Sequence, residues 1–178
     1  RLRDRSYPTH RRGNAAAPMT ERTKRIRDRL DQVHAETWPV LTRLSPEAMS
    51  ITVYNSEGGI WTVKDLLGHL ADSEAGLLGQ AQRLVSGEQT VPPDFDLARW
   101  NRSAVRRSKE TSAAELLEKI LGAHQASLQF LDGLSDDQLD LVGRHSSGAT
   151  LSTERFLLRI ADHRAEHVAD IRAAVAGG

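Results

Sequence analysis

The chain has 178 residues, with 24 basic side chains, 24 acidic side chains, seven histidines and no cysteine. A chain of this length suits one domain and can bury a hydrophobic core without disulfide bonds. The balanced charge excludes the strongly basic surface of a general nucleic-acid-binding protein, and the missing cysteine excludes both a disulfide framework and a thiol nucleophile within the chain.

Composition also bears on location and fold class. No apolar run approaches the roughly 20 residues needed to span a bilayer, and no segment has the charged start and apolar middle of a secretory signal. We therefore expect a cytoplasmic protein with no membrane partner. Aromatic residues are scarce, and the abundance of Leu, Ala, Arg, Glu and Gln favours helices over sheets.

Residues 1–18 differ from the rest of the chain. They carry five arginines against one aspartate, contain two prolines and His10, and show no apolar period. We expect a disordered N-terminal extension here and a single domain over residues 19–178. Met19 directly precedes the first helical pattern, so we favour Met19 as the natural start over an Arg-rich targeting or nucleic-acid-binding arm.

Several segments show apolar residues at spacings of three and four, which is typical of amphipathic helices. Two of them begin with a capping box, in which a hydroxyl caps the first turn and an acid follows three residues later. These are Thr62 with Asp65, and Ser112 with Glu115. Long helices are predicted over residues 20–44, 62–87, 112–131 and 152–176, with a shorter polar helix over 94–108 and a helical turn starting at 135.

The breaks between helices are also predictable. Pro39 is expected to kink the first helix or to split it after Trp38. The polar stretches 46–59 and 143–148 contain glycine and are expected to be connectors. Four long helices joined by loops predict an all-α four-helix bundle with essentially no sheet.

His163 and His167 are four residues apart, so their side chains are neighbours on one helical face. That face is otherwise apolar, through Phe156, Ile160 and Ile171. Imidazoles in an apolar stripe are costly unless their nitrogens find partners. A divalent metal is one such partner, because imidazole is a common metal ligand. Spacing alone leaves two interpretations open: a metal-binding pair, or two histidines that hydrogen-bond within the core.

Residues 163–167 also spell H-x-x-E-H, a protease signature in which Glu166 would be the general base. We do not adopt this interpretation, because such a site takes a further acidic ligand from well downstream and only eleven residues follow His167. Glu166, Asp162 and Asp170 are instead expected to orient an imidazole or to face solvent.

Any third ligand must therefore lie upstream, and His69 is the best candidate. It lies between Leu66 and Leu70, on the core side of the second predicted helix. Asp72 and Glu74, about one turn further on, are the fallback ligands. Alone, a histidine in this position is more often a hydrogen-bonded core residue than a ligand.

The other histidines have no partner that the sequence identifies. His34 lies near the predicted kink, His124 lies in the third long helix, and His145 lies in a loop. We interpret these three as structural or solvated. Trp100 and Asn101 are candidate pocket-wall residues, although Trp100 would also suit packing at one end of the bundle.

Two stretches of the chain resemble the two signatures of the DinB-like family. Residues 61–74 (WTVKDLLGHLADSE) resemble the first signature, and residues 161–171 (ADHRAEHVADI) resemble the second, which has one histidine or a pair on the last helix. Residues 94–101 (DFDLARWN) and 131–139 (LDGLSDDQL) are also similar to family members. The resemblance spans about residues 19–174, and the order and separation of the stretches make it specific.

The resemblance implies an up-down-down-up bundle and a divalent metal, usually zinc or nickel, held by His69, His163 and His167. The family includes bacillithiol S-transferases and is related to mycothiol-dependent maleylpyruvate isomerases. It is distinct from the DNA-repair polymerase of similar name, so it implies a small-molecule substrate and no nucleic acid. Members commonly pair as dimers, so a homodimer is expected. The chain departs from some thiol-transferase-like members at Glu74, where they carry histidine.

Together these observations predict a metal-dependent transferase that joins a low-molecular-weight thiol to a small electrophile. Three protein ligands leave an open position on a metal, where the pKa of a thiol or water is lowered. Because the chain has no cysteine, the thiol must come from solution as a co-substrate. The alternatives are a metal-dependent hydrolase that uses metal-bound hydroxide, and a bundle that binds a metal or ligand without catalysis.

Overall fold

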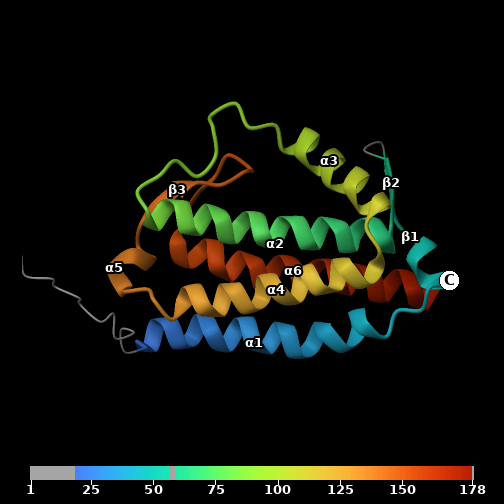
Figure 1. Ribbon diagram of the computed structural model, residues 1–178, viewed down its shortest axis with the longest axis horizontal. Coiled ribbons are helices and arrows are strands. Elements are labelled where there is room, and N and C mark those ends of the chain that lie inside the picture. Colours follow the sequence, from blue (N-terminus) through green and yellow to red (C-terminus); the bar gives the residue numbers. More distant parts are fainter. Residues whose placement is uncertain (1–18, 57–58, 178) are drawn as a thin grey trace, which may run out of the picture.

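The computed structural model describes residues 19–56 and 59–177, which fold into a helical bundle with two short hairpins (Figure 1). Four long helices form the bundle: α1 (Glu21–Thr42), α2 (Val63–Val85), α4 (Ala113–Leu131) and α6 (Thr153–Gly177). In Figure 1, α1 and α6 run in one direction and α2 and α4 run in the other. The predicted all-α, up-down-down-up four-helix bundle is confirmed.

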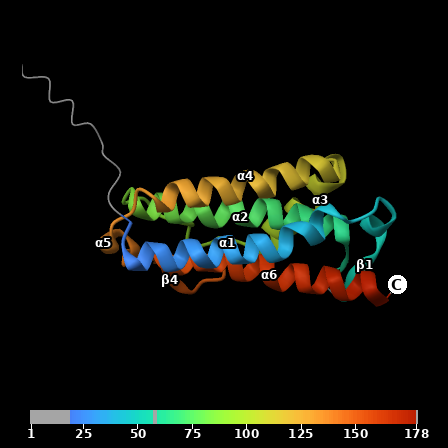
Figure 2. The same ribbon diagram turned by 90° about the horizontal axis from the view of Figure 1, so that it is seen from below.

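The order of packing around the bundle follows from this topology. Helix α6 packs against both α1 and α2, and α4 packs against α2 and α1. Figure 2 shows α2 and α4 in one layer and α1 and α6 in the other. Because α2 and α4 are parallel, the chain between them must return along the bundle. The returning segment contains α3 (Leu97–Glu110), which packs against α2.

The helices begin where the sequence supplies caps. The Thr62 hydroxyl accepts a hydrogen bond from the Asp65 backbone amide (3.3 Å), and the Asp65 carboxylate accepts one from the Thr62 amide (3.0 Å). Ser112 and Glu115 form the same reciprocal pair at the start of α4. Both predicted capping boxes are therefore present, and the first one sets the start of the helix that contains His69.

Helix α1 continues through Pro39, so of the two predicted alternatives, a kink or a split after Trp38, the split does not occur. The proline lies in the last turn of the helix, so only a few residues follow the point where its missing amide donor interrupts the hydrogen-bond ladder. Thr37 and Leu41 on either side are buried, and the Thr37 hydroxyl donates to the Val33 carbonyl (2.6 Å). Packing against the core thus holds this turn helical.

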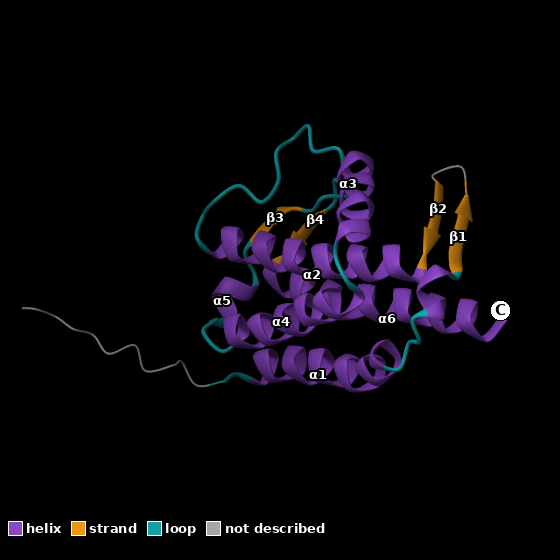
Figure 3. Ribbon diagram, turned by 45° about the vertical axis from the view of Figure 1, so that its right-hand side comes forward, coloured by secondary structure: helices purple, strands orange, loops and turns teal. Residues whose placement is uncertain are grey.

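The mainly helical fold is as predicted, but a short two-stranded hairpin, not predicted from the sequence, lies at each of the two predicted connectors (Figure 3). The first connector contains a 3₁₀ turn, Glu47–Ser50, and a hairpin of β1 (Thr52–Ser56) and β2 (Gly59–Thr62). The second connector lies within a hairpin of β3 (Val142–Arg144) and β4 (Thr150–Ser152), which follows the short helix α5 (Asp136–Leu139). β-branched residues on both sides of each turn favour pairing, and the first hairpin adds the aromatic residues Tyr54 and Trp61.

The hydrophobic core has two parts with a polar layer between them. One part includes Phe156 and Leu157, and the other includes Leu66 and Ile171. Between these parts, four polar or charged side chains, one from each bundle helix, form a connected row. Glu74 contacts Arg164, Arg164 contacts His34, and His34 stacks on His124. The four side chains are His34 of α1, Glu74 of α2, His124 of α4 and Arg164 of α6.

Within the described residues, no helix is both long enough and apolar enough to cross a bilayer. The predicted N-terminal extension, residues 1–18, lies outside the described residues. Thr20 caps the N-terminus of α1, and its hydroxyl donates a hydrogen bond to the Asp136 carboxylate (2.7 Å). This bond joins the start of α1 to α5.

Candidate functional site

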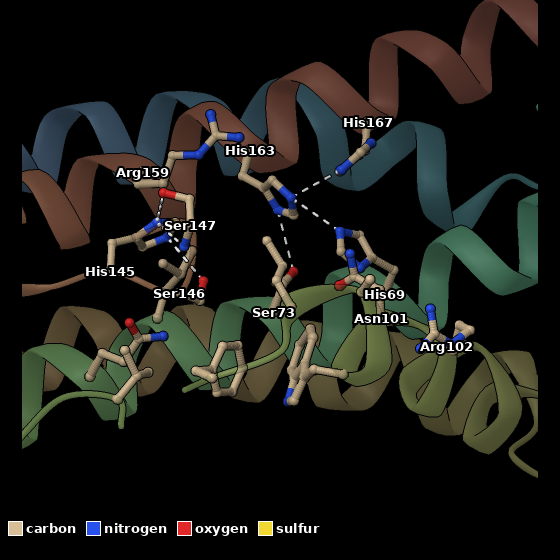
Figure 4. A pocket seen from close by; sticks show the side chains of 18 of the residues that line it. His69, Ser73, Asn101, Arg102, His145, Ser146, Ser147, Arg159, His163 and His167 are labelled. Atoms are coloured by element: carbon tan, nitrogen blue, oxygen red, sulfur yellow. Dashed lines mark hydrogen bonds between the residues drawn. The ribbon is translucent and has the colours of Figure 1, made fainter. Parts of the chain in front are cut away.

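Three histidines from two helices converge on the wall of a pocket. His69 comes from α2, and His163 and His167 come from α6. The Nε2 atom of His163 lies 3.1 Å from Nε2 of His69 and 3.0 Å from Nε2 of His167 (Figure 4). One ligand atom from each residue lies within 4.8 Å of the others. The structure therefore brings together the three histidines that the sequence singled out, from positions up to 98 residues apart.

The outer ring nitrogens of two of these histidines are held by neighbouring side chains. Nδ1 of His163 lies 3.3 Å from the Ser73 hydroxyl. Nδ1 of His167 lies 2.9 Å from the Tyr54 hydroxyl, which also hydrogen-bonds to Asp170. Such contacts fix the tautomer and orientation of an imidazole, leaving its Nε2 lone pair directed inward.

Burial keeps the three imidazoles neutral. It lowers the pKa of His69 to about 4, with a smaller contribution from His167. It lowers the pKa of His163 further, to about 2, and the other two histidines add to that effect. The pKa of His167 is also lowered by burial, although Asp170 opposes the shift. Neutral imidazole is the form that binds a metal ion.

This donor set fits a divalent metal. Nitrogen ligands at about 2.05 Å from one tetrahedral ion lie roughly 3.3 Å from each other, close to the Nε2 separations seen here. Three neutral imidazoles that face one another cannot all satisfy their nitrogens, because each contact needs one donor and one acceptor. Nδ1 of His69 is buried and has no hydrogen-bond partner among the described residues.

The fallback ligands lie elsewhere. Glu74 is fully buried and pairs with Arg164, on the side of α2 that faces the bundle core. Asp72 pairs with Arg107 of α3 (2.6 Å). Glu166 forms a two-point ion pair with Arg159. Each of these carboxylates thus has a cationic partner, and none of them joins the histidine cluster.

The histidine cluster opens into a cavity of about 700 Å³. Its walls come from α2, α3, α6 and both hairpins. Trp61 and Trp100 lie edge-on to His69, with ring centroids 5.2 and 6.5 Å away. Trp100 and Asn101 therefore line the pocket, as the sequence interpretation allowed, and they lie next to the histidines.

Sequence reasoning missed part of this pocket. Tyr54 on β1 and Arg159 on α6 line it, and so does His145, which was interpreted as structural or solvated. The β3–β4 turn carries His145 to the cavity, where its ring lies 5.8 Å from the ring of Phe156. The position of Arg159, one turn before His163 on the same face, was a usable signal. No local sequence pattern predicts that Tyr54 or His145 lines the pocket, because hairpin pairing and tertiary packing determine where these side chains lie.

His34 and His124 lie apart from the cluster, in the polar layer. Their rings stack with centroids 4.0 Å apart and planes 4° apart, and His34 also stacks on Trp38. This arrangement agrees with the first of the two interpretations given for them, structural or solvated.

Proteins of known structure share this fold. YfiT of Bacillus subtilis, described as a probable metal-dependent hydrolase with an unusual four-helix bundle topology, matches with a TM-score of 0.71 and 21% identity over 90% of each chain. The mycothiol-dependent maleylpyruvate isomerase matches with a TM-score of 0.65 and 15% identity, over 84% of this chain and 60% of that one.

The chain also resembles a known protein by sequence. The protein of Oceanobacillus iheyensis named "Putative metal-dependent hydrolase OB0413" is 22% identical over 117 residues, which is 66% of this chain and 66% of that relative. The alignment thus spans just under two thirds of the relative's length. The profile of the DinB superfamily matches residues 17–171, which include all three histidines of the cluster. The chain belongs to the DinB superfamily.

Proposed function

We propose that His69, His163 and His167 bind one divalent metal ion, zinc or nickel, and that the protein is an enzyme whose reaction depends on this ion. The observation that carries this proposal is the convergence of three neutral Nε2 atoms on the wall of an open cavity. Three protein ligands leave a coordination position for a small molecule, as in catalytic rather than structural metal sites.

The proposed reaction is transfer of a low-molecular-weight thiol to a small electrophile. When bound, the metal supplies a Lewis acid that lowers the pKa of a thiol or of water. A sulfur–carbon bond forms as the bond from carbon to the leaving group breaks, and the thiol proton passes to solvent. Supporting this, the chain has no cysteine of its own, and one protein of the same fold is mycothiol-dependent.

The surrounding side chains have defined tasks in this proposal. Tyr54 and Asp170 hold His167, and Ser73 holds His163. Burial and Asp170 raise the pKa of Tyr54, so its hydroxyl keeps its proton and can donate to that carboxylate. Trp61 and Trp100 flank His69 and limit the access of water to this end of the cavity.

The second candidate is a metal-dependent hydrolase, in which water cleaves an ester or amide. The names given to the two bacterial relatives favour it. It uses the same three histidines but needs no thiol. The two candidates can therefore be separated by their dependence on an added thiol.

The test uses metal-loaded protein and a chloronitroarene, with and without bacillithiol, mycothiol or glutathione. Thiol-dependent release of chloride that is lost in a His163→Ala variant is expected for the transferase. Thiol-independent cleavage of a nitrophenyl ester, lost in the same variant, would instead favour the hydrolase. Inactivity in both assays would favour a non-catalytic binding protein. Pairing as a homodimer and a cytoplasmic location stay predictions.

A further inference from the structure

The pocket has a second polar end, which the proposed reaction does not use. We call it the arginine end; it comprises Gln80, Arg83, His145, Ser146 and Arg159. On α6, Arg159 lies eight residues before His167, which corresponds to roughly 12 Å along a helix. Figure 4 shows Arg159, His145 and Ser146 gathered on one side of His163, and His69 and Asn101 on the other. The cavity is therefore elongated, with His69, Asn101 and Arg102 towards one end and Arg159, His145 and Ser146 towards the other (Figure 4).

The charged groups that line the cavity are all cationic. Arg83, Arg102 and Arg159 line it, and among residues 19–56 and 59–177 no aspartate or glutamate does. The protein as a whole has no net charge with its histidines neutral, so this bias is local. Arg83 has no carboxylate partner among the described residues and donates only to the Thr90 carbonyl (3.0 Å). A cavity with this lining favours an anionic ligand.

Arg159 already binds one carboxylate. Its two terminal nitrogens lie 2.7 and 2.9 Å from the two oxygens of Glu166, in the fork geometry that guanidinium groups form with carboxylates. The Arg159 and Glu166 side chains are 36% and 55% exposed, and ion pairs that solvent reaches in this way contribute little to stability. The guanidinium can therefore exchange Glu166 for a ligand carboxylate at low cost.

His145 and Gln80 add uncharged hydrogen-bonding groups. The Ser147 amide donates to Nδ1 of His145 (3.1 Å), so the neutral ring carries its proton on Nε2 and is a donor there. Gln80 is 6% exposed, and its buried Oε1 atom has no hydrogen-bond partner among the described residues. A buried carbonyl oxygen without a hydrogen-bond donor is costly in the free protein. A ligand that hydrogen-bonds to it would remove that cost.

We propose that the arginine end binds a carboxylate of an extended, peptide-like ligand whose reactive group lies at the histidine cluster. Only the placement of the ligand's reactive group at the histidine cluster rests on the proposed function. The carboxylate contacts Arg159, with Arg83 and His145 beside it, and a polar group in the middle of the ligand contacts Gln80. The thiol co-substrate is then an acidic one, and a small neutral thiol is a poor substitute.

The test is isothermal titration calorimetry with S-methylglutathione and with its diethyl ester. The first probe has two free carboxylates and the second has none, and neither has a free thiol. We expect the acid to bind about tenfold more tightly than the ester, in keeping with loss of a charge-assisted hydrogen bond. Arg159→Gln should remove this preference. Arg155→Gln changes an exposed arginine on the same helix and outside the cavity, so it should leave the preference intact.

Two further variants guard against misfolding and separate this proposal from the metal site. Gln80→Leu should weaken binding of the acid while raising the melting temperature, because it removes an unpaired buried amide. His163→Ala should keep the preference for the acid, since the methylated sulfur needs no metal. Failure of the metal proposal would therefore leave this result unchanged. Equal binding of acid and ester, no binding of the acid, or a preference that survives Arg159→Gln would overturn the proposal.

Discussion

Arg164 reaches Glu74 across the centre of the bundle and also contacts the other two long helices. Nε of Arg164 donates to Glu74 (2.7 Å), and Nη2 pairs with the second oxygen of the same carboxylate. Nη1 lies 2.9 Å from Nδ1 of His34 on α1, and Nη2 lies 3.4 Å from the Ile120 carbonyl on α4. Since Arg164 directly follows His163, this pair fixes α6 against α2 beside the histidine cluster.

Removal of one partner from this pair should be strongly destabilising. Glu74→Gln leaves a buried guanidinium without its counter-charge, and we expect the free energy of unfolding to fall by about 3–5 kcal/mol. Urea unfolding measures this loss. Asp162→Asn, which breaks the exposed pair with Arg29, should cost less than about 1 kcal/mol. The folded Glu74→Gln variant should keep its bound metal. Loss of the metal from this variant would make Glu74 a candidate ligand again.

The metal site makes a stoichiometric prediction. Purified or metal-reconstituted protein should hold close to one divalent ion per chain, measured by elemental analysis. His69→Ala, His163→Ala and His167→Ala should each lose most of it, because two remaining imidazoles form a poor chelate.

The other described histidines provide the controls for this experiment. His34, His124 and His145 lie outside the cluster, so their alanine variants should keep the metal. Unchanged metal in a folded His69→Ala variant would show that His69 is not the third ligand.

Tyr54 should tune the site without forming part of it. Tyr54→Phe keeps the ring and removes the hydroxyl that joins Nδ1 of His167 to Asp170. Loss of such an outer partner commonly reduces metal affinity by about tenfold or more. Competition with a chelator measures the change, and Thr52→Ser on the same strand is a control outside the cavity. Equal affinities of Tyr54→Phe and the parent protein would contradict the role given to this hydroxyl.

Acid should destabilise the metal-free protein, partly through His124. Burial, His34 and Arg164 lower its pKa to about 4, while Asp31 opposes them. As pH falls below the ordinary value of 6.5, the unfolded chain takes up a proton that the folded chain does not bind. Stability from this group is therefore complete above pH 6.5 and is lost as the pH falls towards 4.

The loss from this one group should reach about 3 kcal/mol at most, and urea unfolding with a chelator present measures it. The three clustered histidines shift in the same direction, so the contribution of His124 is obtained by difference. In His124→Gln, the fall in stability between about pH 7 and about pH 5 should be smaller. An unchanged slope would contradict this assignment.

Gly68 should be intolerant of a side chain. A Cβ atom there would lie 2.2 Å from Cβ of Ser108, so α3 would have to move away from α2. We expect Gly68→Ala to cost about 1–3 kcal/mol and to change the fluorescence of Trp100, which α3 carries into the cavity. Gly122→Ala is the matched control, since a Cβ on this helical glycine meets open space and should be neutral or stabilising.

Local patterns in the sequence were sufficient for the helices and for two of the three histidines. Thr62 with Asp65 marks the start of α2, and the spacing of His163 and His167 places both on one face. Contacts between distant segments were not predictable in this way. Glu74 looked like a ligand because its partner, Arg164, lies 90 residues later.

The hairpins show a different kind of error. Residues 52–54 and 60–62 are rich in β-branched and aromatic side chains, so the strand signal was present but the polar, glycine-containing setting outweighed it. Only hairpin pairing and packing reveal that β1 places Tyr54 against His167 and that the β3–β4 turn places His145 at the far end of the cavity.

The cavity walls come from two kinds of structure that can change independently. Helices α2 and α6 supply the three histidines, and the polar layer holds these helices in register. Helix α3 and the two hairpins are connections between bundle helices, and they supply much of the remaining wall. Insertions or substitutions in these connections can reshape the cavity with little effect on the histidines. Divergence of substrate preference among descendants of one bundle is therefore expected to accumulate in α3 and the hairpins, while the histidine-bearing helices stay under purifying selection.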